Sequence, residues 1–249
     1  MQTAKWEQQC RTWSGPTSDT EDQKRDRTEN AIRDAILNSP ELTGRAVRVF
    51  AKGSYKNNTN VRLDSDVDVA VEFQEAMYYD AMDEVEGLSQ AGLGLTPYSG
   101  SYPIGRFKDD VEHALVKHFG SLAVDRGNKA IHLREDSRSL SADVVPCFTY
   151  HRYYAMGYNS RPLYFEGIQI HPESGSRIEN WPQQSYENGT AKNNATGRRY
   201  KRMVRILKRL ENSMVEEGII EEVPSFLIES LVYNVPNEGF HNETYLQYV

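Results

Sequence analysis

Residues 50–71 read FAKGSYKNNTNVRLDSDVDVAV, a stretch in which two strand patterns flank a polar connection. The first pattern covers residues 45–51, where β-branched residues recur in alternation, and the second covers residues 66–73. The connection between them is rich in Gly, Ser and Asn, which is typical of a loop with at most a short helix. We therefore predict two strands joined by this loop, with a glycine and a serine after the first and two aspartates opening the second.

The rest of the chain predicts an α+β protein with two lobes. Ser18 and Glu21 have the spacing of a capping box, which indicates a long helix over residues 19–37. Further strands are expected at residues 129–133, 140–148 and 163–170. Further helices are expected at residues 74–88, 105–119, 196–217 and 224–235. A β-rich half followed by a helical half is typical of two lobes with a cleft between them.

Three carboxylates are candidate metal ligands. Asp66 and Asp68 lie two residues apart on the second predicted strand, so both point to one face while the intervening valines point to the other. An Asp-x-Asp pair alone is equally typical of a solvated strand face. Asp143 lies inside an apolar strand pattern, where we expect it to be buried at a cost that a metal ion or a cation would offset.

The turn that precedes these acids is suited to phosphate. Gly53 lets backbone N–H groups approach a phosphate closely, and Ser54 adds a hydroxyl donor. Three carboxylates beside such a turn predict a site for two divalent ions, which clamps the α-phosphate of a nucleoside triphosphate and activates a hydroxyl as nucleophile. An all-oxygen site favours Mg²⁺, and Mn²⁺ is the expected substitute.

Eight basic residues lie between residues 192 and 209, with no acid among them. We expect most of them to form a solvated helix face, balanced by Glu211, Glu216 and Glu217. One or two are expected to face the cleft and hold triphosphate oxygens. Ser225, at the start of the last predicted helix, is a candidate to add a hydroxyl and backbone amides to the same phosphates.

The composition excludes several classes of protein. The net charge of −7 over 249 residues argues against a surface that binds duplex nucleic acid throughout. No signal-peptide core and no long apolar run is present, so we expect neither export nor a membrane span. Cys10 and Cys147 are interpreted as free thiols in a reducing compartment, which points to the cytoplasm. The six histidines show no pairing typical of metal ligands and are interpreted as surface or structural residues.

Several strings together resemble a known family. The 50–71 stretch resembles the active-site signature of DNA polymerase β-like nucleotidyltransferases, including those that modify antibiotics or tail RNA. The strings SADVVPCFTYHRY, YENGTAKNNATGRRYKRMVRILKRL and PSFLIESLVYNVP narrow this to the bacterial CD-NTases. These enzymes are similar to cyclic GMP-AMP synthase and make cyclic oligonucleotide signals in anti-phage defence. The resemblance spans roughly residues 48–236.

The resemblance implies an architecture and a set of site residues. Residues 1–172 would form the catalytic lobe with an N-terminal spine helix, and residues 173–249 a helical lobe that closes the nucleotide cleft and ends earlier than in relatives. The implied metal ligands are Asp66, Asp68 and Asp143. The implied substrate contacts are Gly53 and Ser54 on the donor triphosphate, Lys201 and Ser225 on phosphate, and Phe226, where relatives often have tyrosine, on the donor base.

The resemblance also implies a reaction. A 2′- or 3′-hydroxyl of one triphosphate attacks another, pyrophosphate leaves, and the linear intermediate turns over and cyclises to a di- or trinucleotide. Asp143 would accept the hydroxyl proton. The expected substrates are ATP and a second nucleoside triphosphate, and the expected setting is anti-phage (CBASS) signalling. We expect a monomer that needs neither membrane nor nucleic acid, with regulatory partner proteins encoded nearby.

Two other functions remain open at this point. One is a nucleotidyltransferase that modifies a protein, an RNA or a small molecule, and the other is an inactive nucleotide-binding module. The lack of a broad basic surface disfavours an RNA acceptor. The presence of all three acids disfavours an inactive module.

Overall fold

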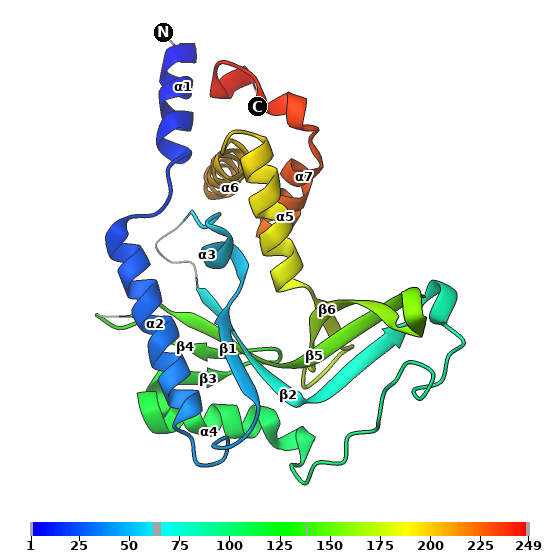
Figure 1. Ribbon diagram of the computed structural model, residues 1–249. Helices are drawn as coiled ribbons and strands as arrows, with labels where there is room; N and C mark the ends of the chain where they lie inside the picture. The colour runs from blue at the N-terminus through cyan, green and yellow to red at the C-terminus, as the bar shows by residue number, and fades with distance from the viewer. Residues whose placement is uncertain (1, 62–65, 138, 248–249) are drawn as a thin grey trace. The chain divides into compact units, whose positions relative to one another are not determined.

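The computed structural model describes residues 2–61, 66–137 and 139–247 and divides the chain into two compact units (Figure 1). Unit 1 consists of residues 1–23, 53–65 and 184–249, and unit 2 of residues 24–52 and 66–183. Both units are discontinuous in sequence, whereas the sequence predicted one boundary between two continuous lobes, after residue 172. Among the described residues, no helix is long and apolar enough to cross a membrane.

A mixed β-sheet forms the centre of unit 2. Its strands are β1 (Val47–Ala51), β2 (Val67–Ala81), β3 (Val124–Arg126), β4 (Ile131–Leu133), β5 (Ala142–Met156), β6 (Pro162–Ile170) and β7 (Ile178–Asn180). The strand order is β1-β2-β5-β4-β3, and β6 pairs with both β5 and β7. The pair β2–β5 is parallel, and the other pairs are antiparallel. Mixed sheet and helices confirm the predicted α+β class.

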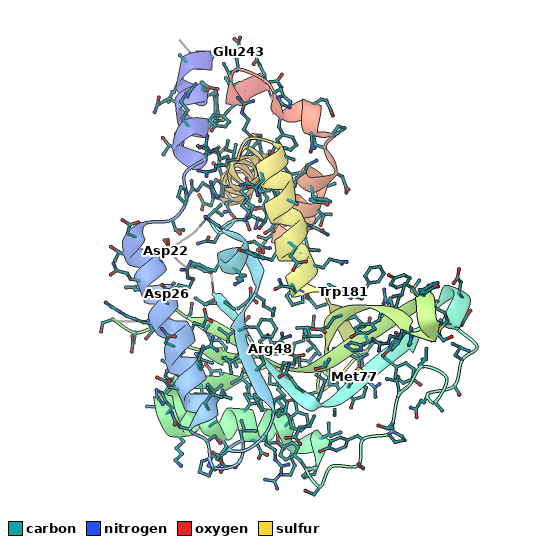
Figure 2. The ribbon with its side chains drawn as sticks, in the orientation of Figure 1. Asp22, Asp26, Arg48, Met77, Trp181 and Glu243 are labelled. Atoms are coloured by element: carbon teal, nitrogen blue, oxygen red, sulfur yellow. The ribbon has the colours of Figure 1, made fainter. Side chains whose placement is uncertain are left out.

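The predicted helix at residues 74–88 is wrong, because β2 continues through most of it. The register between β2 and β5 shifts between Phe73 and Met77, and pairing then resumes as far as Ala81. Met77, where pairing resumes, is labelled on β2 in Figure 2. This irregularity interrupts the period of two that identifies a strand, and the residues after it were misread as helical. Pairing with the equally long β5 overrides the local preference.

The two faces of β2 are both covered near its start. Val67, Val69 and Val71 are fully buried on one face, as the alternation predicted. On the opposite face Ala70 packs with residues of β5 and β6 in a second cluster. Arg48 of β1, labelled in Figure 2, donates to the buried Glu72 of β2 at 2.7 Å, which compensates that carboxylate. The aspartates at the start of β2 are therefore held on a rigid, well-packed strand.

Two helices predicted from the sequence are confirmed around this sheet. Helix α2 (Asp19–Leu37) begins after Ser18, whose hydroxyl accepts the Glu21 N–H at 3.3 Å as the capping box requires. Helix α4 (Phe107–Phe119) contacts β3 and β5. Short 3₁₀ helices lie at Asp83–Val85, Ile104–Arg106, Ser121–Ala123, Tyr158–Ser160, Asn237–Phe240 and Tyr245–Gln247.

Unit 1 is helical. Its helices are α1 (Gln2–Trp13), α3 (Gly53–Asn57), α5 (Pro182–Ala195), α6 (Tyr200–Glu216) and α7 (Ser225–Asn234), of which α5 begins just before the unit boundary. One face of α6 packs with α1, α7 and Phe240 around a shared core. The amphipathic pattern predicted α6 and α7, whereas α1 and α5 were missed. Helix α3 is the short helix allowed for in the polar connection, of which residues 62–65 lie outside the described residues.

Candidate active site

The register of the sheet brings two of the predicted acids side by side. Asp68 of β2 is the direct partner of Asp143 on the parallel strand β5. Asp66 lies two residues before Asp68, next to Val67, whose N–H donates to the Ser141 carbonyl at 2.9 Å. Because directly paired residues and residues two apart share a face, all three carboxylates lie on the same face at one end of the β2–β5 pair.

A histidine completes this cluster. His132 of β4 is the register partner of Asp143, and its Nδ1 lies 3.2 Å from Asp143 Oδ1 and 3.8 Å from Asp66 Oδ2. One ligand atom from each of these three side chains lies within 4.8 Å of the others. Sequence reasoning set the histidines aside, because only the β4–β5 register, which the sequence does not reveal, places one beside Asp143.

The acids are accessible to solvent. The side chain of Asp143 is 39% exposed and that of Asp66 38% exposed. The expectation that Asp143 is buried is wrong: β5 is buried over much of its length, but this face opens where Asp143 lies near the strand's beginning. Accessible, converging carboxylate oxygens with an imidazole nitrogen are a donor set that fits a divalent cation.

Asp68 forms an ion pair with a lysine. Lys52 Nζ lies 3.2 Å from Asp68 Oδ1, and the Lys52 N–H donates to the Asp68 carbonyl at 2.9 Å. The lysine side chain is 12% exposed and that of Asp68 34%. This pairing orients the Asp68 carboxylate through Oδ1 and leaves Oδ2 outside the contact.

Gly53 and Ser54 belong to unit 1, where they form the first turn of α3. Gly53 has φ of 69°, a left-handed conformation that favours glycine. The Ser54 carbonyl accepts the Thr59 N–H at 2.9 Å, which closes the turn after α3. The predicted glycine is therefore required by the backbone at this position.

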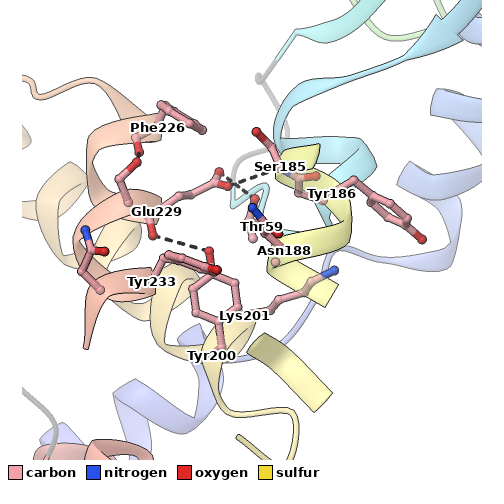
Figure 3. Close-up of a pocket in the computed structure, with 13 residues that line it drawn as sticks. Thr59, Ser185, Tyr186, Asn188, Tyr200, Lys201, Phe226, Glu229 and Tyr233 are labelled. Atoms are coloured by element: carbon pink, nitrogen blue, oxygen red, sulfur yellow. Dashed lines mark hydrogen bonds between the residues drawn. The ribbon is translucent and has the colours of Figure 1, made fainter. Parts of the chain in front are cut away.

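A cavity of about 240 Å³ lies among α5, α6, α7 and the turn after α3 (Figure 3). It is lined by Lys201 and Phe226, two of the residues proposed to bind nucleotide, and by Tyr186, whose ring centroid lies 5.7 Å from Lys201 Nζ. Phe226 is 64% exposed, so its ring is available for stacking. Ser225 begins α7 but is not among the described residues that line the cavity.

A buried ion pair supports this cavity and was not predicted. Lys208 Nζ lies 2.6 Å from Glu229 Oε1, and the residues are 2% and 7% exposed. The same carboxylate accepts the Thr59 hydroxyl at 2.8 Å, as Figure 3 shows, and the Asn57 amide at 3.4 Å. Through Glu229, the network ties α6 and α7 to the turn after α3.

The basic run of α6 is mostly structural, not a solvated face as predicted. Arg205, 5% exposed, donates to the carbonyls of Ser14 and Asn58. Arg209 donates to the carbonyl of Trp13, and Lys208 forms the buried pair. The amphipathic pattern did not reveal this, because these arginines are satisfied by neutral carbonyls from segments distant in sequence.

The comparisons with known proteins agree with the fold. Residues 187–249 match the family model of the cGAS/DncV-like nucleotidyltransferase C-terminal helical domain. A Legionella pneumophila cyclic dipyrimidine nucleotide synthase, CdnE, is 42% identical over 242 residues, which cover 96% of this chain and 80% of that protein.

Two solved structures extend the likeness. The Rhodothermus marinus CdnE c-UMP-AMP synthase with Apcpp and Upnpp has a TM-score of 0.82 and 32% identity, over 97% of this chain and 79% of that one. The Elizabethkingia meningoseptica CdnE cyclic dinucleotide synthase with GTP and Apcpp has a TM-score of 0.77 and 38% identity, over 97% and 80%. These matches extend over both units, so the polymerase β-like fold and the converging acids have one explanation: the chain is a nucleotidyltransferase of the bacterial CD-NTase family.

Proposed function

We propose that the protein joins nucleoside triphosphates into a cyclic dinucleotide, or a cyclic trinucleotide, in a Mg²⁺-dependent reaction that releases pyrophosphate. The observation that supports this most directly is that the carboxylates of Asp66 and Asp143 converge, with Asp68 paired directly opposite Asp143 on the neighbouring strand. Relatives of which this chain covers about four fifths are named as cyclic dinucleotide synthases, and solved examples hold triphosphates or their analogues. The setting that we propose is anti-phage (CBASS) signalling in the cytoplasm, by a monomer.

Asp66, Asp68 and Asp143 are the proposed ligands of two Mg²⁺ ions. When bound, the ions would supply neutralisation of the triphosphate charge and a lowered pKa for the attacking hydroxyl. Asp143 would accept the hydroxyl proton as the new bond from oxygen to the α-phosphorus forms and the bond to pyrophosphate breaks. Because the same carboxylates serve both successive bonds, a linear intermediate that turns around in the site is sufficient for cyclisation.

The remaining residues are proposed to bind the nucleotides. Gly53 and Ser54 would bind the donor triphosphate, and Lys201 would pair with the negative charge of its phosphates. Phe226, exposed at the cavity of unit 1, would stack on the donor base. Ser225, at the first turn of α7, is proposed as a further phosphate contact through its hydroxyl and the helix N-terminus.

The proposal predicts a phosphatase-resistant product. Purified protein given the four ribonucleoside triphosphates with Mg²⁺ or Mn²⁺ should release one pyrophosphate for each phosphodiester formed, and mass spectrometry should identify a cyclic species. Omitting one triphosphate at a time identifies the bases. Products that are only linear, or attached to protein, RNA or a small acceptor, would contradict cyclisation and support the alternative transfer reaction.

A second prediction concerns His132. Its ring contacts Asp143, so replacing it with alanine removes either a nitrogen ligand or the group that orients a ligand. Loss of such a contact typically weakens metal binding by about 10- to 100-fold. We expect His132→Ala to raise the Mn²⁺ dissociation constant, measured by electron paramagnetic resonance, by about this factor. As a control, His113→Ala, at an exposed site on α4, should leave it unchanged. Equal Mn²⁺ affinity in both variants would show that His132 does not contribute to metal binding.

A further inference from the structure

Unit 1 contains a second cavity, of about 540 Å³, whose lining is strongly basic. Its cations are Arg11 of α1, Arg198 of the turn between α5 and α6, and Lys201, Arg202 and Arg205 at the start of α6. No aspartate or glutamate is among the described residues that line it. In a chain whose net charge is −7, this concentration of positive charge needs an explanation.

The positive charge of this cationic cavity is poorly compensated. Arg11 pairs with Glu7 at 2.8 Å, but among the described residues the other four cations form no ion pair. In the part of the chain that the structure describes, Arg205 donates to neutral carbonyls and to no carboxylate, and its burial, with Arg209 and Arg202 nearby, lowers its pKa to about 10. Burial, with Arg205 nearby, also lowers the pKa of Lys201. A bound anion would relieve this repulsion.

The backbone holds one of these cations in an unusual conformation. Gly197 and Arg198 both have positive φ, 58° and 65°, and the Arg198 N–H donates to the Asn193 carbonyl at 2.7 Å. Arginine rarely adopts this left-handed conformation, and such strain is concentrated at ligand-binding and switch sites. Here it places an exposed guanidinium at the cavity, although glycine would suit the backbone better.

We propose that the cationic cavity is a second anion site, which binds a small oligophosphate of three or more phosphates, free or carried on a nucleotide. Guanidinium groups pair with phosphate oxygens in bidentate geometry, and four of the five cations are arginines. A single phosphate would leave most of this charge uncompensated. A volume of about 540 Å³ is that of a small-molecule site, whereas duplex nucleic acid is bound by an extended surface.

The cationic cavity is coupled by shared residues to the cavity of about 240 Å³ lined by Lys201 and Phe226, which we call the nucleotide cavity. Lys201 lines both cavities. Asn57 at the end of α3 and Thr59 after it line the first, and Asn58 between them lines the second. An oligophosphate in the cationic cavity would draw on the Lys201 charge and repel a triphosphate in the nucleotide cavity. The sign of this coupling, which is inhibitory, rests on the proposed function, whereas the binding itself does not.

Binding is tested on the full chain by calorimetric titration with inorganic tripolyphosphate, without divalent metal. The variant Arg198→Glu with Arg202→Glu changes two exposed cations that lie outside the nucleotide cavity. We expect it to weaken tripolyphosphate binding at least tenfold. The matched variant Arg27→Glu with Lys117→Glu makes the same change in net charge at exposed positions of α2 and α4. It should change the dissociation constant of tripolyphosphate less than twofold. Equal weakening in both variants, or no binding to the wild type, would overturn the site.

Coupling is tested with a non-hydrolysable ATP analogue at constant free Mg²⁺. As tripolyphosphate increases, the apparent dissociation constant of the analogue should rise several-fold and then reach a plateau, and this component should be absent from the double variant. A rise that continues in proportion to tripolyphosphate is simple competition in the nucleotide cavity and contradicts a second site. Tighter binding of duplex RNA than of tripolyphosphate, lost in the double variant, would overturn the small-molecule assignment. Neither arm requires turnover, so failure of the synthase assay leaves both results interpretable.

Discussion

The double variant Asp66→Asn with Asp68→Asn is expected to lose nucleotidyl transfer by at least about 10³-fold while remaining folded. Asparagine keeps the side-chain volume but removes the negative charge that a divalent cation requires. The side chains of Asp66 and Asp68 are 38% and 34% exposed. The neutral amides therefore have access to water and cost little in folding free energy. Pyrophosphate release measures turnover, and a thermal melt measures the fold.

The control for this prediction is a second pair of exposed aspartates. Asp26→Asn with Asp34→Asn makes the same chemical change at exposed positions of α2 that are not part of the cluster of Asp66, His132 and Asp143. We expect its turnover to equal that of the wild type within about twofold, since surface changes of this kind rarely alter the fold. Turnover of the active-site variant within tenfold of the wild type would contradict the assignment of both acids as metal ligands.

Replacing Lys208 with methionine is expected to remove a large part of the protein's folding stability. The methionine leaves Glu229 buried without its cation, and breaking one side of a buried pair typically costs about 3–5 kcal/mol. The pair is 2.6 Å apart and Lys208 is 2% exposed, so water cannot replace the lysine. Urea unfolding followed by circular dichroism measures the change in the free energy of unfolding.

A second variant distinguishes the ion pair from simple packing. Lys208→Met with Glu229→Gln removes both charges, and the glutamine carbonyl can still accept from Thr59, so most of the lost stability should return. Arg33→Met, which breaks the half-exposed pair with Glu29, should cost less than about 1 kcal/mol. A Lys208→Met variant as stable as Arg33→Met would show that the buried pair contributes nothing net.

Local patterns predicted the two strands that carry the three candidate acids. The alternation from Asp66 onward predicted the start of β2 and the face on which its aspartates lie. The helices α2, α4, α6 and α7 were also predicted, because their caps or apolar periods lie within one segment. The extension of β2 past Phe73 was missed, since an irregularity in pairing breaks the period of two and only the partner strand restores it.

The sequence by itself determined the chemistry of this protein: three aspartates, a glycine–serine turn and a basic helix, in an order that resembles one family of nucleotidyltransferases. Only the tertiary structure decided which side chains meet. The β2–β5 register pairs Asp68 with Asp143, and the β4–β5 register brings His132 to the acids. The packing of α6 against α7 pairs Lys208 with Glu229. Strand register and helix packing depend on contacts between residues far apart in the chain, and no local pattern encodes those contacts.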